Sequence, residues 1–260
     1  MKKLIFLVIG LLFVLMSISF AQQQAQMKVH KTGGQIDTYS ISDIDSVTFA
    51  DCSTPDTIPT RCIVAYYPFN GNANDESGNG YNGVVNGAIL TTDRKGNNNR
   101  AYYFNGLSYI DIPNAVKLPQ GNDPRSISVW IYNSSQTNQV IVEWGLVESL
   151  KRCILGIADA SGFVGFSIYG ADLATLVSVR DNKWHNIVLT YDGTTAKMFM
   201  DGIYQNSKIM GNLNTSGYNL YFGKNHRGNE EEYNTGSIDD IRIYNCALSD
   251  NEIKALFNEN

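Results

Sequence analysis

The stretch that decides the fold is "TGSIDDIRIYNCALSDNEIKALF", which runs from Thr235 to Phe257. Its first half alternates apolar and polar residues, and this pattern predicts a half-buried β-strand. Its second half predicts a short helix over 249–257, because Ser249 is a good N-cap and Glu252 follows three residues later, as in a capping box. The chain therefore closes with a strand, a turn and a helix.

Two adjacent acids, Asp239 and Asp240, stand inside this predicted strand. Strand alternation places Asp239 on the same face as Ile241 and Ile243, which predicts that Asp239 points into the core. An unpaired buried carboxylate is costly, so Asp239 needs a cation or several hydrogen-bond donors. The nature of that partner bears on the function of the protein.

Composition favours an all-β protein with many turns. The chain has 260 residues, 17% of them charged, with 23 glycines and a net charge of −5. This length suits one large domain or two small ones. Because the protein is mildly acidic, the sequence offers no electrostatic argument for binding nucleic acid or an anionic membrane surface.

The first residues have the pattern of a secretory signal peptide, predicted over 1–21. Two lysines precede an apolar run from Leu4 to Met16, and small residues lead to a cleavage site after Ala21. The alternative is a retained membrane anchor. No later segment is long and apolar enough to span a bilayer, so the sequence predicts a secreted or cell-surface protein without a membrane span in its mature chain.

Two short segments precede the main domain. Residues 27–50 contain β-type runs broken by Thr32-Gly33-Gly34, which predicts a small N-terminal β-hairpin module. The segment is too small to hold a core by itself, and it resembles a module near the N-terminus of many secreted bacterial proteins. Residues 51–61 carry two prolines and are predicted to be a linker.

The four cysteines are Cys52, Cys62, Cys153 and Cys246. An even number of cysteines in an exported protein suggests two disulfides. One scheme pairs Cys52 with Cys62, across a short loop, and Cys153 with Cys246. The other pairs Cys62 with Cys246, at the ends of two strands that could pair antiparallel, and Cys52 with Cys153. The sequence leaves both open.

Turn signals recur along the rest of the chain, as in "NGNANDESGNG", "KGNNN" and "YDGTT". Between them lie short runs such as "RSISVWIYN" and "HNIVLTYDG", several of which are apolar on both faces. This pattern predicts two antiparallel sheets packed face to face in a β-sandwich, with the terminal helix as its only helical element.

Four separated motifs make the resemblance to a family specific. They are "IVAYYPFNGNANDESGNGYNGVVNGA" (63–88), "SISVWIY" (126–132), "DNKWHNIVLTYDGTTAKMFMDGIYQN" (181–206) and "GSIDDIRIYNCALSDNEIKALF" (236–257). In this order they resemble the laminin-G-like jelly-roll family of the concanavalin A-like lectin/glucanase superfamily. The resemblance covers residues 62–257 and implies a two-sheet jelly-roll β-sandwich. It says little about function, because this fold hosts many functions.

A structural calcium ion is one expectation. The loop "NGNANDESGNG" follows the predicted first strand and can approach Asp239 if the first and last strands are neighbours. It offers oxygen ligands, which calcium prefers, and members of the resembled family often bind calcium. We therefore expect Ca²⁺ at Asp75 and Asp239, with Asp240 or Glu76 as further ligands. The alternative is that Asp75 caps its own turn and Asp239 accepts backbone hydrogen bonds.

The resemblance to lectins also directs attention to aromatic side chains, since lectins stack rings on sugars. The candidates for ligand contact are Tyr81, Tyr109, Trp144, Tyr169, Tyr218 and Tyr233. Trp130 and Trp184 occupy motif positions that are expected to pack in the core or at an edge. The expected partner is an extracellular carbohydrate or, alternatively, a surface protein bound without sugar specificity.

Catalysis has little support. The glucanases of the superfamily carry a tight cluster of acids on one strand, and this chain has none. Glu143 and Glu148 are five residues apart, so they would point to opposite faces of a continuous strand. The sequence also lacks the elbow motif of serine hydrolases. We therefore expect a binding module without enzymatic activity, with a glycoside hydrolase or lyase as the remote alternative.

Overall fold

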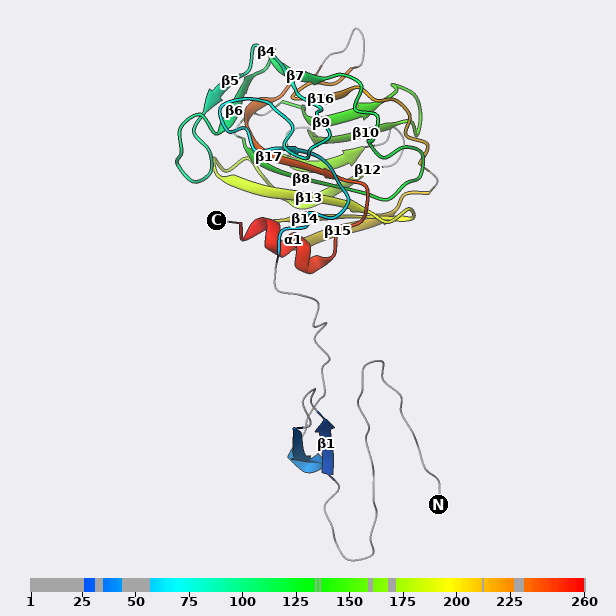
Figure 1. Ribbon diagram of the computed structural model, residues 1–260. Coiled ribbons are helices and arrows are strands. Elements are labelled where there is room, and N and C mark those ends of the chain that lie inside the picture. Colours follow the sequence, from blue (N-terminus) through cyan, green and yellow to red (C-terminus); the bar gives the residue numbers. More distant parts are fainter. Residues whose placement is uncertain are drawn as a thin grey trace, which may run out of the picture. The chain divides into compact units, whose positions relative to one another are not determined.

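The computed structural model describes residues 26–30, 35–43, 57–133, 135, 137–158, 161–167, 172–211, 213–226 and 232–259 (Figure 1). They fall into two separate units, an N-terminal hairpin and a large domain. The predicted signal peptide over 1–21 and most of the predicted linker lie outside the described residues. Among the residues described, no helix has the length and apolar character required to cross a bilayer.

The N-terminal unit is a two-stranded antiparallel hairpin. Strand β1 (Gln26–His30) pairs with β2 (Ile36–Ser40), and a 3-10 turn, η1 (Ile41–Asp43), follows. Ile36 and Tyr39 are about half exposed, as expected for a hairpin that is too small to form a core. The hairpin predicted within residues 27–50 is therefore present.

The large domain is a sandwich of two antiparallel sheets. Its elements are β3 (Ile63–Tyr67), β4 (Val84–Asn86), β5 (Ile89–Thr91), β6 (Ala101–Asn105), β7 (Tyr109–Ile112), β8 (Arg125–Tyr132), β9 (Gln139–Gly145), β10 (Arg152–Ala158), β11 (Phe163–Ser167), β12 (Asp172–Ser178), β13 (Trp184–Tyr191), β14 (Thr195–Met200), β15 (Ile203–Ile209), β16 (Leu220–Phe222), β17 (Thr235–Tyr244) and α1 (Asp250–Phe257). One sheet has the order β12-β11-β10-β9-β16-β7-β4, and the other has the order β15-β14-β13-β8-β17-β6-β5, with β3 also paired to β17. The predicted all-β jelly-roll is confirmed.

The core fills the space between the sheets. Every second residue of each central strand points inward and is buried, including Ile127, Val129 and Ile131 of β8 and Val142, Trp144, Leu220 and Phe222 of the facing sheet. Residues on the outer face of β8 are buried too, because the loops and α1 cover that face. Such double coverage explains why the central strands are apolar on both faces in the sequence.

A β-bulge in β17 changes the predicted side-chain direction of Asp239. Asp239 lies opposite Trp130 on β8, whereas Arg242 lies opposite Ser128, so β17 carries one extra residue between the two pairs. Asp240 adopts φ +53° at this point. The prediction that Asp239 shares the core face with Ile241 is therefore wrong, because the bulge interrupts the two-residue alternation and leaves both aspartates outside the core.

Helix α1 begins where the sequence predicted. The hydroxyl of Ser249 accepts a hydrogen bond from the backbone N–H of Glu252, and the Glu252 carboxylate accepts one from the backbone N–H of Ser249. Ile253 and Leu256 of the helix pack with Val188 in a second apolar cluster. Helix α1 thus covers part of the outer face of the eight-stranded sheet, beside β14 and β15 (Figure 1).

A disulfide joins Cys62 to Cys246 at the ends of β3 and β17, as in the second of the two predicted pairing schemes. Cys153 is a free thiol inside the core, where burial raises its pKa to about 12. The predicted disulfides of Cys153, to Cys246 or to Cys52, are therefore not formed, because Cys153 faces the sandwich interior. Cys52 lies outside the described residues.

We expect this disulfide to contribute strongly to stability. It joins residues 184 positions apart, and closing a loop of that length reduces the entropy of the unfolded chain, which raises its free energy by about 5 kcal/mol at room temperature. The Cys62→Ser/Cys246→Ser variant should unfold at much lower urea concentration than the oxidised wild type. Adding a reductant should destabilise the wild type and leave the variant unchanged. Coinciding urea curves for the oxidised wild type and the variant would contradict the assignment.

Candidate functional site

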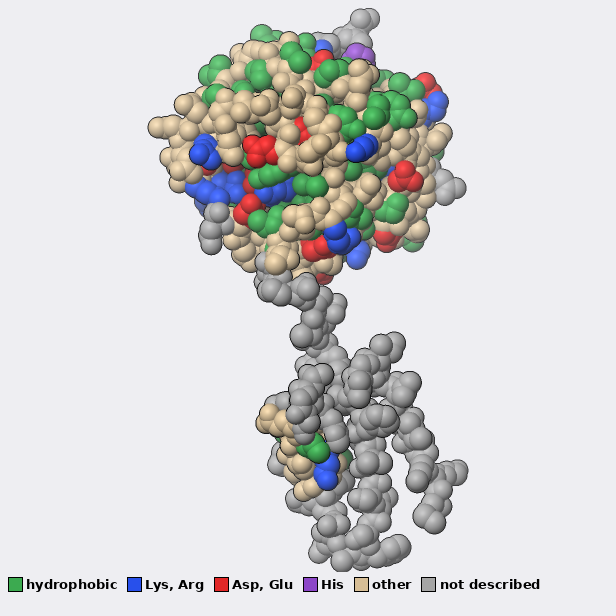
Figure 2. Space-filling model, viewed as in Figure 1, with side chains coloured by type: hydrophobic (Ala, Val, Ile, Leu, Met, Phe, Trp, Pro, Cys, Tyr) green, Lys and Arg blue, Asp and Glu red, His purple; other side chains and the backbone are tan. Residues whose placement is uncertain are grey.

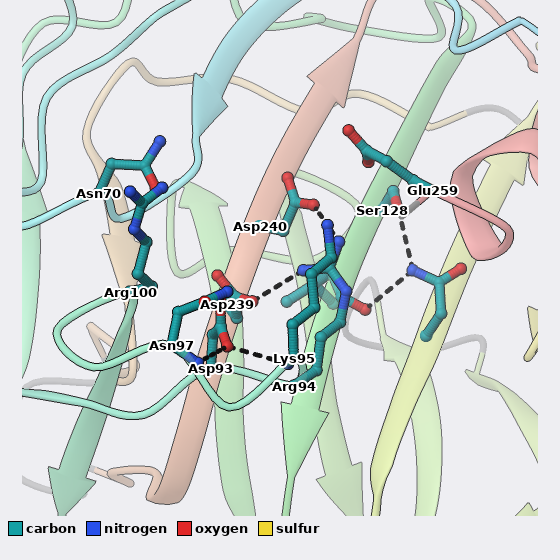
Figure 3. A network of polar contacts seen from close by, with 12 residues as sticks. Asn70, Asp93, Arg94, Lys95, Asn97, Arg100, Ser128, Asp239, Asp240 and Glu259 are labelled. Atoms are coloured by element: carbon teal, nitrogen blue, oxygen red, sulfur yellow. Dashed lines mark hydrogen bonds and ion pairs between the residues drawn. The ribbon is translucent and has the colours of Figure 1, made fainter.

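The two aspartates of the β17 bulge share one arginine (Figure 3). Arg94 donates through Nη1 to Asp239 at 2.8 Å and through Nη2 to Asp240 at 2.9 Å. All three side chains are nearly buried, with 9% or less of each exposed. The cation that a buried Asp239 requires is thus supplied by a guanidinium group of the chain itself.

A second arginine completes the network. Arg242 lies 3.1 Å from Asp240 and forms a two-pronged ion pair with Glu259, at 2.6 and 2.9 Å. It also donates to the hydroxyl of Tyr66, and its guanidinium lies 4.3 Å from the centre of that ring. The residues after α1 are thereby tied to the outer face of β17 and to β3.

The loop between β5 and β6 is shaped to present Arg94. The carboxylate of Asp93 accepts hydrogen bonds from the backbone N–H groups of Lys95 and Asn97, at 2.9 and 2.7 Å, and from the Asn97 side chain at 3.0 Å. These bonds make a tight turn in the loop. The turn therefore holds the loop backbone that carries Arg94, while the ion pairs with Asp239 and Asp240 hold its side chain.

Burial controls the ionisation of the two aspartates. It is the main cause that raises the pKa of Asp239 to about 7, the neighbouring charge of Asp240 raises it further, and Arg94 opposes both effects. Burial also raises the pKa of Asp240, against the influence of Arg242. Near neutral pH, therefore, the two aspartates can share one proton while they remain bound to the arginines.

The calcium ligands expected from the sequence have other partners. Asp75 accepts hydrogen bonds from the backbone N–H groups of Tyr66, Ser77 and Tyr81, at 2.9 to 3.0 Å, so it caps its own loop. Glu76 is exposed. Within the described part of the chain, no group of three or more His, Cys, Asp or Glu residues is arranged to hold a metal ion. Calcium at these carboxylates stays a prediction.

A polar pocket and an open depression adjoin Arg94. The pocket, of about 160 Å³, is lined by the two aspartates and by Arg94, Lys95, Arg100 and Glu259, among others. The depression, of about 480 Å³, shares Arg94, Lys95 and Glu259 with the pocket. Figure 2 shows acidic and basic side chains gathered on the face that carries β17 and the end of α1.

Aromatic side chains form the rest of the depression, which is lined by Trp130, Trp184 and Phe257. Phe257 stacks on Trp130 with ring centres 5.8 Å apart and planes 18° apart, and the Arg94 guanidinium lies 4.7 Å from the centre of Trp130. Trp184 rests against Tyr132. The depression thus combines apolar rings with charged groups that can donate and accept hydrogen bonds. Hereafter it is called the tryptophan depression.

The aromatic residues predicted to contact a ligand are scattered over the domain. Trp144 is fully buried and donates to the carbonyl of Pro119, so its predicted ligand contact is wrong. Tyr81 packs against the core, and its hydroxyl accepts a hydrogen bond from the loop at residue 117. Tyr109 and Tyr233 come together, with ring centres 6.4 Å apart. Tyr218 is exposed, and Tyr169 lies outside the described residues.

The sequence did not single out Arg94, Trp184 or Phe257 as functional residues. The recognisable signal for Arg94 was the loop "DRKGNNN" (93–99), where a turn-forming Asp precedes an arginine. Trp184 is expected to pack in the core or at an edge, and it does pack on Tyr132 while leaving part of its ring exposed.

The two glutamates considered for catalysis are held apart. Glu143 is completely buried on β9 and forms a two-pronged ion pair with Arg152, both bonds being 2.9 Å. Glu148 is exposed in a turn and pairs with Lys151. The two carboxylates therefore do not form a pair across a common cleft.

The raised pKa of Asp239 predicts how stability depends on pH. Its folded pKa is about 7 against an ordinary value of 3.8, so its contribution to stability is full below about pH 4 and is lost as the pH rises through 7. The slope from one such group is at most about 1.4 kcal/mol per pH unit. Thermal unfolding of Asp239→Asn should depend less on pH between 5 and 8 than that of the wild type. Glu148→Gln is the control, and equal slopes for all three proteins would contradict the assignment.

Solved structures share this fold at low sequence identity. Domain 4 of AbnA, a GH43 extracellular arabinanase from Geobacillus stearothermophilus, solved with arabinotriose, is 20% identical with a TM-score of 0.62, over 75% of this chain and 98% of that chain. The binding domain of Paraclostridial Mosquitocidal Protein 1 is 17% identical with a TM-score of 0.63, over 76% and 52%. The binding domain of Botulinum neurotoxin DC, solved with rat synaptotagmin II, is 15% identical with a TM-score of 0.60, over 78% and 52%.

This chain spans about half the length of the two toxin binding domains that it matches. No curated protein matches it. A family model, Laminin_G_3, described as the concanavalin A-like lectin/glucanases superfamily, matches residues 104–254. Because that match covers more than half of the chain, the protein belongs to the Laminin_G_3 family of the concanavalin A-like lectin/glucanases superfamily.

Proposed function

We propose that the protein is a secreted, non-catalytic module that binds extracellular carbohydrate in the tryptophan depression. The observation that carries this proposal is the meeting of Trp130, Trp184 and Phe257 with Arg94 and Glu259 in one open hollow. Export is inferred from the signal-peptide pattern of residues 1–21.

The chemistry of the depression suits a sugar ring. The C–H face of a sugar is apolar and packs on an aromatic ring, while its hydroxyl groups at the ring edge donate and accept hydrogen bonds. Trp184 offers a partly exposed ring, and Glu259 and Lys95 offer an acceptor and a donor beside it. Arg94 is held by two ion pairs, so it loses little conformational freedom when a ligand binds.

The known ligand of a protein with the same fold supports this class of function. The arabinanase domain is complexed with arabinotriose, an oligosaccharide. The likeness of this chain to that domain concerns the fold, so it favours binding of a saccharide in general and no particular sugar.

The absence of catalysis is part of the proposal. Retaining glycosidases place two carboxyl groups about 5 Å apart, and inverting enzymes place them about 6.5 to 9.5 Å apart, with a cleft between them. Here Asp239 and Asp240 are engaged by Arg94, and Glu143 is engaged by Arg152. These carboxylates serve as anchors for arginines, and we expect no hydrolysis of the bound sugar.

Affinity electrophoresis through gels that contain a panel of neutral and acidic polysaccharides tests the proposal. At least one polysaccharide should retard the wild type, and Trp184→Ala should weaken that retardation about tenfold or more, as loss of an exposed aromatic anchor does. Phe163→Ala, which removes an exposed ring on the other sheet, is the control and should bind like the wild type. Equal retardation of Trp184→Ala and the wild type would exclude the depression as the site.

A protein ligand is the second candidate function. The edge strands β12 and β15 lie side by side and expose Leu176, Ile203 and Ile209 by 65%, 67% and 73%. Exposed apolar residues on sheet edges are typical of surfaces that pair with other chains. Binding to cell surfaces that survives periodate oxidation of glycans but is lost after proteolysis would favour this function over carbohydrate binding.

A further inference from the structure

A second group of aromatic residues lies on the opposite sheet. On β7 and β16 the residues Ile110, Ile112, Leu220 and Phe222 point into the core. Strand alternation therefore turns Tyr109, Asp111 and Tyr221 outward, onto the outer face of the seven-stranded sheet. All three side chains are partly exposed.

Residues after β16 and before β17 complete the group. The ammonium group of Lys224 lies 4.7 Å from the ring centre of Tyr109 and 5.6 Å from that of Tyr233. His226 stacks on Tyr221, with ring centres 5.5 Å apart and planes 7° apart. We call Tyr109, Asp111, Tyr221, Lys224, His226 and Tyr233 the tyrosine platform.

The segments that carry the platform are firmly held. Asn225 and Glu232 exchange three hydrogen bonds of 2.8 to 3.0 Å through backbone and side chains, and Asn234 donates to the carbonyl of Gly223 at 2.8 Å. Lys224 and Tyr233 are paired in an antiparallel bridge. The rings and the ammonium group are therefore positioned before any ligand arrives.

A buried ion pair supports the platform from one side. Glu143, next to Tyr221 across the sheet, is bound by Arg152, and its carboxylate also accepts a hydrogen bond from the backbone N–H of His226. This hydrogen bond holds the backbone of His226 against the outer face of the sheet at Glu143. The platform is thus connected through Glu143 to β9 and β10 of the same sheet.

We propose that the tyrosine platform is a second carbohydrate-binding surface, which makes the domain bivalent. The depression lies on the outer face of the eight-stranded sheet and the platform on the outer face of the seven-stranded sheet. One short oligosaccharide cannot contact both. The class of ligand, a carbohydrate, rests on the proposed function. The place of the second site is argued from the platform residues alone.

The charges of the platform point to a neutral oligosaccharide. Asp111 is an acceptor whose pKa is raised by burial and lowered by the nearby Lys224 and His226. A carboxylate beside an ammonium group satisfies the hydroxyl groups of a sugar, which both donate and accept. The ammonium group of Lys224 offsets the charge of the Asp111 carboxylate, so the platform does not favour a charged ligand of either sign, and a neutral sugar is favoured.

Isothermal titration calorimetry with neutral trisaccharides, arabinotriose, xylotriose and cellotriose, tests the inference on the full mature chain. For a bound trisaccharide we expect two sites per chain. Trp184→Ala should leave one site, and Tyr109→Ala/Tyr233→Ala should leave the other. Tyr109→Phe/Tyr233→Phe, which keeps both rings, should retain binding to the platform, and Tyr204→Ala, on the far edge strand, should bind like the wild type.

The outcomes separate the two proposals. One site that is lost in Trp184→Ala contradicts the platform and leaves the proposed function intact. One site that is lost only in the tyrosine variants supports the platform and contradicts the depression. No heat with any trisaccharide, and no polysaccharide that retards the protein, contradicts both. If the Tyr109→Ala/Tyr233→Ala variant unfolds at a lower temperature than the wild type, Tyr221→Ala replaces it as the platform variant.

Discussion

The central constraint on the structure is the burial of two adjacent carboxylates, Asp239 and Asp240, on the outer face of β17. Asp239 and Asp240 are stable there only because Arg94 reaches them from the β5–β6 loop and Arg242 from their own strand. The same arginines reach further, because Arg94 also lies over the ring of Trp130 and Arg242 also pairs with Glu259 after α1. The hollow proposed to bind sugar is the space these parts leave beside Trp184 and Phe257.

Local patterns predicted much of the fold. The alternation in β17, the capping box of α1 and the order of four separated motifs lead to the two-sheet sandwich that the structure shows. The bond between Cys62 and Cys246 was one of two open schemes, and it followed from strand pairing. Each of these features depends on neighbouring residues or on a pairing that the motif order implies.

The site was less predictable, because its decisive contacts join distant residues. Asp239 and Arg94 are 145 positions apart, and no local signal connects them. The bulge at Asp240 reversed the face on which Asp239 lies, since the alternation rule holds only for strands without an extra residue. Trp144 is a candidate ligand contact by residue type alone, and it is buried because it points from β9 into the core between the two sheets.

The disulfide encloses almost the whole sandwich, because Cys62 precedes its first strand and Cys246 follows its last. A protease that cuts an exposed loop anywhere between these residues leaves two fragments that remain covalently joined. The interdigitated strands then hold the fragments in register, so a nicked molecule keeps both sheets and both outer faces. The ring formed by one covalent bond thus makes the domain tolerant of cuts in its loops.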